Sequence, residues 1–484
     1  MRQFIYEQLA NTLKNDIDAK KWRANEKLPS IRTLANTHRV SKISVQKAMQ
    51  TLEARGIVYV KVKSGYYVSP PKLIEQVNLV TKEVNQPKLV DVPELFYEIM
   101  ERSAAFDIAP LNVDNAQTSN NILLLNRHIT RAIRQKPQNN ALYYSSPPGD
   151  IDLRHQISEH YRKRNLNIST QEICITSGCQ NSLFLALMVT CQPGDIVAVE
   201  SPAFYGVLQL LQQLKLKVVE IPSSYTQGIT YHALKNAAAK WNIKACVLTA
   251  NFATPTGALI PLKEKQKIVE FAAENDITLI EDDIYGDLGF HTSIAPLKSF
   301  DIQDGVILCG SFSKSLSRDL RIGWIVAKKH YKKIVHMKLI YQLSTSQAIQ
   351  KGLTSFLAEG HYERHLYQYR KTLIKQRDQL LKAIMDNWQT PIKYTVPDGG
   401  LAIWVQLPNE VDTLLLYEKS ISEGIILTPG RLFSSSNKFS NCLRLSFAHP
   451  TTGHRLDGLI KLAQLCKSAL SVQAREIQKL SREE

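Results

Sequence analysis

The sequence lacks an apolar run long enough to cross a membrane, and its cysteines do not have metal-ligand spacing. The longest apolar stretches, such as 183–189 and 196–199, fall far short of the roughly 20 residues that a membrane-spanning helix needs. The first residues do not have the pattern of a signal peptide. The seven cysteines are scattered, and we expect most of them to be small buried hydrophobes. These absences predict a cytoplasmic protein without a membrane partner.

Acidic residues are fewer than basic residues, and the excess of positive charge is unevenly distributed along the chain. The 484 residues include 60 Lys and Arg against 44 Asp and Glu, a formal net charge of +16. Thirteen of the basic residues and only five of the acidic ones lie before residue 72, so half of the excess falls in a small part of the chain. Such an excess favours a polyanionic partner. A second basic stretch, 328–382, predicts long helices, and a solvated helix face is the commoner explanation of its charge.

The first 70 residues have the pattern of three helices followed by a hairpin. Apolar residues recur at helical spacing across 5–17, and a second short helix begins after Ser30. Ser41 is well placed to cap a third helix. Its apolar positions would form a buried stripe of Val45, Ala48, Met49 and Leu52. The alternation over 57–62 and 65–68, around Lys63 and Ser64, predicts a two-stranded hairpin, and the whole pattern predicts a winged helix-turn-helix.

The outward face of the third helix carries cationic, hydroxyl and amide side chains. They are Lys42, Ser44, Gln46, Lys47 and Gln50. A recognition helix enters the major groove of DNA, where such side chains bond to phosphates and base edges. On these residues alone, a three-helix protein-interaction module with a solvated basic face stays open as an alternative.

The run LPSIRTLANTHRVSKISVQKAMQTLEARGIVYVKVKSGYYV, residues 28–68, resembles the GntR family of winged-helix repressors. The resemblance implies that four positions contact DNA: Arg32, Lys42, Gln46 and the wing glycine Gly65. The outward face adds Ser44 and Lys47. The family usually carries arginines at the two recognition-helix positions, where this chain has Lys42 and Gln46. Base preference and affinity are therefore expected to differ, because lysine is a point charge and glutamine has none.

We expect four segments along the chain: the DNA-binding domain at 1–70, a linker at 71–106 with one short helix near 94–102, a large domain at 107–470 and a polar tail at 471–484. In the large domain helices alternate with short apolar strands, which predicts an α/β fold with a mostly parallel sheet. The strands are expected at 196–199, 217–219, 245–248, 278–280 and 306–309.

Three polar motifs follow predicted strands, at the sheet edge where ligands bind in such folds. Residues 176–180, TSGCQ, form a glycine turn that opens a helix, and backbone amides at a helix start bind anions. Residues 281–285, EDDIY, place acids directly after a strand, and residues 310–314, GSFSK, place a lysine there. Each motif alone also has an ordinary explanation, as a strand-to-helix turn, a capping carboxylate or a solvated lysine.

In this order and spacing the three motifs resemble those of the fold type I aminotransferases, which hold pyridoxal 5′-phosphate (PLP), and the resemblance covers about 143–447. It implies a smaller C-terminal subdomain. It also implies Lys314 as the Schiff-base lysine, Asp282 as the partner of the pyridine nitrogen and Tyr285 as the donor to the ring hydroxyl. Phe204 would stack on the ring. The phosphate would be held by Gly178, Cys179, Gln180, Ser311, Ser313 and Arg321.

Two further segments match the aminotransferases, and one departs from them. LYYSSPPGDIDLR resembles the strip that reaches into the neighbouring subunit's site, which implicates Tyr144. In CLRLSFA, Arg444 matches the arginine that clasps a substrate carboxylate. Thr254 occupies the position of the usual asparagine that bonds the ring hydroxyl. Threonine is shorter, so we expect cofactor binding to survive with poorer electronic tuning, and Asn251 cannot be assumed to substitute.

Both halves together resemble the MocR subgroup of bacterial regulators. The resemblance implies a homodimer in which the DNA-binding module of one subunit packs near the aminotransferase-like domain of the other. The prediction is a transcriptional regulator that binds double-stranded DNA, holds PLP, and senses PLP or an amino compound. Two alternatives stay open: a working PLP-dependent aminotransferase with an accessory winged helix, and a regulator whose cofactor domain binds nothing.

Overall fold

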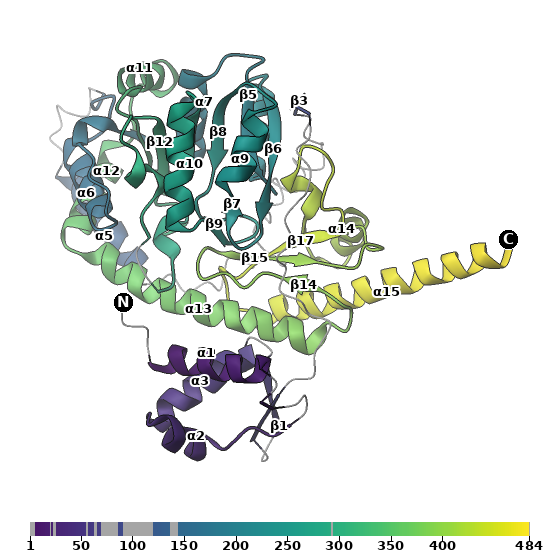
Figure 1. Cartoon of the computed structure of the whole chain (residues 1–484). Coiled ribbons are helices and arrows are strands. Elements are labelled where there is room, and N and C mark those ends of the chain that lie inside the picture. The colour runs from purple at the N-terminus through teal and green to yellow at the C-terminus, as the bar shows by residue number, and fades with distance from the viewer. Residues whose placement is uncertain are drawn as a thin grey trace.

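The computed structural model describes residues 5–19, 21–22, 26–54, 57–61, 65–68, 86–90, 120–135, 144–291 and 294–483. Figure 1 shows a small N-terminal helical domain, a large α/β part, and a C-terminal part from which helix α15 projects. Within these ranges, no helix combines the length and the apolar character that crossing a membrane requires.

The N-terminal domain is a winged helix-turn-helix, as predicted. Its helices and wing strands are α1 (Ile5–Asp18), α2 (Ile31–His38), α3 (Lys42–Ala54), β1 (Val58–Lys61) and β2 (Gly65–Val68). The strands β1 and β2 pair antiparallel. The predicted turn at Lys63 and Ser64 lies outside the described residues. The segment before α2 also pairs with the wing, which the sequence did not suggest. Leu28 N donates to Tyr66 O at 2.9 Å.

Local signals determine where the helices of this domain begin. Ser30 Oγ accepts a hydrogen bond from Thr33 N at 3.1 Å, and Ser41 Oγ accepts one from Ser44 N at 3.1 Å. Both serines therefore act as N-caps, as was predicted for Ser41. Arg39 ends α2 in the left-handed conformation with φ of 53°, which gives the tight turn into α3. The predicted stripe is buried and consists of Val45, Ala48, Met49 and Leu52.

The central sheet is mostly parallel, and all five expected strands are present in it. They are β5 (Ile196–Ser201), β6 (Lys217–Ser224), β8 (Ile243–Leu248), β11 (Thr278–Asp282) and β12 (Val306–Ser311). The further strands are β3 (Lys88–Leu89), β4 (Ile173–Thr176), β7 (Gly228–Ile229) and β13 (Gly323–Val326). The hydrogen-bonded order is β3-β6-β5-β8-β11-β12-β13-β4, with β7 beside β6. The five expected strands run parallel to one another, as the alternation of helices and strands predicted.

Strand β13 brings the glycine turn next to the lysine motif. Both β4 and β12 pair antiparallel with β13, so their carboxyl ends lie at the same edge of the sheet. The register places Gly323 between Thr176 and Ser311. A Cβ on Gly323 would lie 2.6 Å from the carbonyl carbon of Gly178, so only glycine permits this close approach. Two motifs more than a hundred residues apart therefore become neighbours.

The described part of the predicted linker, 86–90, contributes to the sheet. Strand β3 pairs antiparallel with β6, where Lys88 faces Val218 and Leu89 faces Lys217. Val90 is buried in the core between the sheet and its helices. The short helix expected near 94–102 lies outside the described residues.

Helices cover both faces of the sheet (Figure 1). They include α5 (Asn120–Arg134), α6 (Ile151–Arg162), α7 (Cys179–Thr190), α8 (Tyr205–Gln213), α9 (Tyr231–Ala238), α10 (Leu262–Glu274), α11 (Tyr331–Gln342) and α12 (Gln347–Ala358). Short 3₁₀ helices lie at Thr170–Glu172, Gly286–Leu288, Leu297–Phe300 and Gly430–Phe433. A small hairpin joins β9 (Asn251–Ala253) to β10 (Ala258–Leu259).

The basic stretch 328–382 forms long helices, as predicted: α11, α12 and most of α13 (His361–Asn387). Its lysines at 328, 329, 332, 333, 371, 375 and 382 are exposed, which agrees with a solvated helix face. Lys338 and Arg377 differ from these lysines because they are buried. Lys338 Nζ donates to Pro147 O, and Arg377 Nη1 donates to Pro397 O at 2.8 Å.

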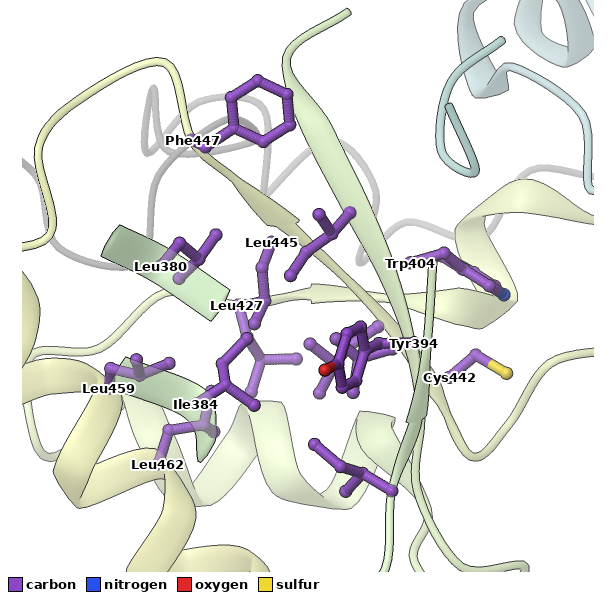
Figure 2. Close-up of a cluster of buried hydrophobic side chains, with 14 of the residues drawn as sticks. Leu380, Ile384, Tyr394, Trp404, Leu427, Cys442, Leu445, Phe447, Leu459 and Leu462 are labelled. Atoms are coloured by element: carbon purple, nitrogen blue, oxygen red, sulfur yellow. The ribbon is translucent and has the colours of Figure 1, made fainter. Parts of the chain in front are cut away.

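The smaller C-terminal subdomain packs a four-stranded antiparallel sheet on helices. Its elements are β14 (Lys393–Tyr394), β15 (Ala402–Gln406), α14 (Thr413–Ile421), β16 (Thr428–Pro429), β17 (Cys442–Ser446) and α15 (His454–Glu483). Figure 2 shows its core, where Leu380 and Ile384 of α13 and Leu459 and Leu462 of α15 lie beside the sheet. Each such side chain contributes about 1.5–3 kcal/mol on burial. This core holds β17, and with it Arg444, beside the large domain.

The winged helix lies against α13 (Figure 1). Glu53, near the end of α3, has its Oε1 4.0 Å from Lys382 Nζ, and Glu7 Oε1 lies 3.1 Å from His291 Nδ1. The first half of α3 points elsewhere, since Lys42 and Gln46 are exposed. The domain is thus attached through the start of α1 and the end of α3, and the start of α3 stays accessible.

Candidate functional site

The three polar motifs line one cavity of about 330 Å³ at the carboxyl edge of the sheet. Nine residues that the sequence singled out line it: Cys179, Gln180, Phe204, Thr254, Asp282, Tyr285, Ser313, Lys314 and Arg321. They come from the starts of α7 and α8 and from the segments after β9, β11 and β12. The loops at the ends of neighbouring strands thus form a single site.

One end of the cavity is suited to an anion. Gly178 precedes α7 with φ of 100°, and a Cβ there would lie 2.6 Å from Arg321 Nη2. Arg321 Nη2 donates to Ser177 O at 2.9 Å, and its Nη1 donates to Ser313 Oγ at 3.3 Å. Helix-start amides, a guanidinium and a hydroxyl together bind phosphate groups well.

Two of the residues expected at this end support their neighbours. Ser311 Oγ donates to Ile322 O at 2.8 Å and accepts from Ser313 N at 3.1 Å, and it does not line the cavity. Gln180 Nε2 donates to Gly206 O at 2.7 Å, which ties the start of α7 to the start of α8. Ser311 therefore positions Ser313, while Gln180 both lines the cavity and braces α8.

Lys314 is half-buried and lies in a positively charged setting. Burial lowers the pKa of its amine to about 7, and the charges of Arg318 and Arg444 act in the same direction. The neighbouring Asp282 acts against them. Because the neutral amine is the nucleophile, this lysine is ready to attack a carbonyl carbon near neutral pH.

Asp282 lies at the base of the cavity. Burial raises the pKa of this carboxyl to about 6. Hydrogen bonds from Cys179 Sγ at 3.0 Å and from Ile284 N at 3.2 Å lower the pKa and so limit the rise. Cys179 thus points its side chain at Asp282, although the resemblance grouped it with the phosphate turn. A buried carboxylate can hold a protonated ring nitrogen by charge and hydrogen bonding together.

Tyr285 and Thr254 also line the cavity. Burial raises the pKa of Tyr285, and the charge of Arg444 acts against this rise, so the phenol stays protonated. Asn251 points elsewhere, because its Nδ2 donates to Asp283 at 3.0 Å and its Oδ1 accepts from Lys265 Nζ at 2.6 Å. Asn251 does not substitute for the missing asparagine.

Arg444 and Tyr144 have very different surroundings. Arg444 on β17 is buried and lines an adjoining hollow together with Thr254, Tyr285 and Lys314. It is therefore placed where a substrate carboxylate could be held beside the lysine. Tyr144 is 78% exposed, and its own chain's cavity does not include it.

Six residues that line the cavity were not predicted as site residues: Leu183, Tyr205, Gly206, Gln209, Ile284 and Arg318. Arg318 comes four residues after Lys314 in the same loop, and this spacing was the available signal. Tyr205 and Gln209 are one helical turn apart on α8, directly after Phe204, so they share a face.

A buried ion pair lies behind the cavity. Arg164 Nη1 donates to Asp283 Oδ2 at 2.5 Å and Nη2 donates to Oδ1 at 2.9 Å, with side chains 4% and 0% exposed. Asp283 also accepts from Tyr161 OH at 3.1 Å. Asp283 directly follows Asp282, so this two-pronged contact fixes the backbone that carries the cavity carboxylate.

A second set of hydrogen bonds reaches the lysine loop from α13. Tyr362 OH donates to Asp287 Oδ2 at 2.7 Å and lies 2.7 Å from Ser315 Oγ. His365 Nε2 lies 2.8 Å from Ser315 O. Ser315 directly follows Lys314, so the first turns of α13 hold the loop that carries the reactive amine.

The expected DNA-contacting side chains lie mostly on the surface of the winged helix. Arg32, Lys42, Gln46, Lys47 and Gly65 are exposed. Ser44 is only partly exposed because its hydroxyl lies 2.9 Å from Ser41 Oγ. Gly65 begins β2 with φ of 113°, a conformation that favours glycine at the wing.

Fold and cavity define the class of protein: a fold type I aminotransferase-like domain joined to a winged-helix DNA-binding domain. The family model of aminotransferase class I and II matches residues 107–456, and that of bacterial regulatory proteins of the gntR family matches residues 5–68. The chain belongs to the aminotransferase class I and II family and, with its gntR-type domain in front, has the architecture of MocR regulators.

Some similar proteins share the whole two-domain architecture, and others share only the aminotransferase-like domain. The HTH-type transcriptional regulator YjiR of Escherichia coli K12 is 34% identical over 96% of this chain and 99% of its own length. Aromatic-amino-acid aminotransferase 1 of Thermococcus litoralis is 29% identical over 71% of this chain and 84% of its own. The crystal structure of Pyrococcus horikoshii kynurenine aminotransferase, in complex with PMP, superimposes with a TM-score of 0.70 at 28% identity, covering 78% of this chain and 95% of that one.

The cofactor of this domain is pyridoxal 5′-phosphate. The cavity fits it, because one space brings together an anion site at Gly178 and Arg321, a buried carboxyl at Asp282 and a lysine amine of lowered pKa at Lys314. When bound, the cofactor supplies a ring that acts as an electron sink.

Proposed function

We propose that this chain is a DNA-binding transcriptional regulator that senses its PLP, or an amino compound that reaches the PLP cavity. The observation that carries the proposal is the position of α13. Its first turns hold the lysine loop through Tyr362 and His365, and its far end faces the winged helix through Lys382 and Glu53. Tyr362 and Lys382 are about 30 Å apart along the helix at about 1.5 Å per residue. One rigid element therefore contacts both the cavity and the DNA-binding domain.

The proposed signal is a change in the packing of this helix. A ligand shifts an equilibrium between two arrangements only by its differential affinity for them. An amino compound with a carboxylate would engage Arg444 and compete for the place of the Lys314 amine. A displaced lysine loop moves Ser315, whose contacts with α13 then differ between the two states.

We also propose a homodimer in which the DNA-binding module of one subunit packs near the aminotransferase-like domain of the other. The exposure of Tyr144 supports this, since that side chain is available to a second subunit. Two winged helices would then contact half-sites one helical turn, or a multiple of it, apart on the DNA.

We propose the domain limits 1–70 and 107–470 with a tail at 471–484. Helix α15 continues through residue 470 without a break.

Binding to DNA is expected to weaken steeply with salt through the exposed lysines of α3. Each phosphate contact contributes about 0.9 to the slope of log affinity against log salt concentration. Lys42→Ala and Lys47→Ala should each lower that slope by about 0.9, measured by fluorescence polarisation on a duplex selected from a random pool. Lys332→Ala, an exposed lysine of α11, is the matched control. An unchanged slope in both α3 variants would contradict phosphate contact by these lysines.

DNA affinity is expected to depend on the cavity, and Tyr362 is expected to transmit the effect. Adding PLP to the cofactor-free protein, or an amino compound to the loaded one, should change the affinity about 5–150-fold, the usual range of coupling between sites. Tyr362→Phe should bind DNA and PLP but give a smaller change, because its link to Ser315 and Asp287 is lost. Tyr367→Phe, an exposed tyrosine of α13, should behave like the wild type. DNA binding that is indifferent to PLP and to every amine tested would refute sensing, but not DNA binding.

A second candidate function is that of a working aminotransferase with an accessory winged helix. The lowered pKa of Lys314 and the position of Arg444 beside it favour this candidate. The test is to follow, in the visible spectrum, conversion of the cofactor from its aldehyde to its amine form with amino acids, and then repeated turnover with a keto acid. Sustained turnover would favour the enzyme.

A further inference from the structure

Three side chains with metal-ligand chemistry meet at the junction of α5, α12 and α13. Glu359 follows α12 and His361 begins α13, while His128 reaches them from α5. Glu359 Oε2 lies 3.7 Å from His128 Nε2 and 3.2 Å from His361 Nε2. The three ligand atoms all lie within 4.8 Å of one another.

We propose that His128, Glu359 and His361 bind a transition-metal ion, with Zn²⁺ as the best match. Zinc bonds to histidine nitrogen and carboxylate oxygen are about 2.0–2.2 Å long, so two ligand atoms of a tetrahedral site are roughly 3.3–3.5 Å apart. The two nitrogen–oxygen distances to Glu359 bracket that value. Two imidazoles and one carboxylate also form a ligand set that zinc uses with an open fourth position.

The site is separate from the PLP cavity. His128 and Glu359 line another cavity, of about 520 Å³, together with residues of α5 and α12 such as Arg131 and Thr354. This cavity and the PLP cavity share no lining residue. A water molecule or a small ligand in the second cavity can therefore reach the fourth position of the ion.

The surrounding structure already holds the ligands in place. His128 is only 8% exposed, and its Nδ1 lies 2.8 Å from Ser355 Oγ, which fixes the ring with Nε2 toward Glu359. Phe356 packs against both imidazoles, with ring centroids 5.9 Å from His128 and 5.4 Å from His361. Hydrogen-bonded and packed ligand rings lower the cost of ordering the site around an ion.

The contact of Arg364 with His361 opposes binding of the ion to this imidazole. Its Nη2 lies 2.6 Å from His361 Nδ1, and an arginine can only donate there, so the ring proton resides on Nε2. Metal binding through Nε2 moves that proton to Nδ1 and displaces Arg364. Removing this arginine should therefore tighten metal binding, which a purely structural cluster does not predict.

Zinc titration of the full-length, PLP-loaded protein against a chromophoric chelator tests the site. We expect one high-affinity Zn²⁺ per chain, an affinity at least about tenfold lower in His128→Ala and Glu359→Gln, and a higher affinity in Arg364→Gln. His155→Ala, an exposed histidine of α6, should match the wild type. Far-ultraviolet circular dichroism verifies that each variant folds, and Glu359→Gln keeps the side-chain shape if His128→Ala does not fold.

Thermal unfolding with and without Zn²⁺ gives an independent readout. An ion that binds only the folded chain raises the unfolding temperature of the wild type, and the rise should disappear in Glu359→Gln. The proposal is overturned if wild type and Glu359→Gln bind zinc with the same affinity, or if zinc leaves the wild-type unfolding temperature unchanged.

Discussion

Replacing Lys314 by alanine should abolish stable retention of the cofactor. The Lys314 amine is the group placed to link the cofactor covalently, and alanine leaves only the non-covalent contacts of residues such as Arg321, Ser313 and Asp282. Protein purified as Lys314→Ala should therefore lose its visible absorbance on dialysis, and borohydride reduction should attach no cofactor mass to it. Lys332→Ala should retain both signals.

The pH dependence of cofactor uptake follows from the same lysine. With a pKa of about 7, the Lys314 amine is about half neutral at pH 7, whereas an ordinary lysine is almost wholly protonated there. The neutral form is the nucleophile, and the fraction of the amine in this form increases as the pH rises through the pKa. The rate of uptake by cofactor-free protein should climb between about pH 6 and 8 and then level off. A rate that keeps climbing to pH 10 would contradict a lowered pKa.

Replacing Arg164 by methionine should destabilise the large domain by about 3–5 kcal/mol. The substitution leaves Asp283 wholly buried with its charge no longer matched by the two-pronged guanidinium contact. Removing one partner of a buried ion pair is costly because the other charge has lost its access to water. The midpoint of denaturant unfolding, followed by far-ultraviolet circular dichroism, measures the loss.

Arg162 provides a matched control two residues away. Its contact with Glu159 lies at the surface, with Arg162 67% exposed, so water screens it. Arg162→Met should change the free energy of unfolding by less than about 1 kcal/mol. Equal losses in the two variants would contradict a special contribution from the buried pair. Since Asp283 adjoins Asp282, Arg164→Met should also weaken PLP binding, while Arg162→Met should not.

Much of the fold follows from signals that are local in sequence. Ser30 and Ser41 start helices by bonding to backbone amides three residues on, so the winged helix could be predicted from short windows. The five strands of the central sheet were predictable because buried parallel strands are short apolar runs. The cavity motifs could be found for the same reason, since each directly follows such a strand.

Other features depend on side chains far apart in the chain. Asp283 meets Arg164 across 119 residues, and neither segment signals the other. The resemblance to the aminotransferases grouped Cys179 with the phosphate turn, yet its sulfur points at Asp282 because strands β4 and β11 lie in one sheet. Residues 86–90 carry no strong strand pattern, and only the free edge of β6 makes them a strand.

The sequence by itself determined that the chain joins a winged helix to an aminotransferase-like domain, and which lysine, aspartate and tyrosine lie at its cavity. Tertiary structure alone decided that α13 contacts both the lysine loop and the winged helix, and that His128 meets Glu359 and His361. The physical reason is that caps, strands and motifs depend on interactions within a few residues. Contacts between helices depend on how all the elements pack, and no single segment encodes that.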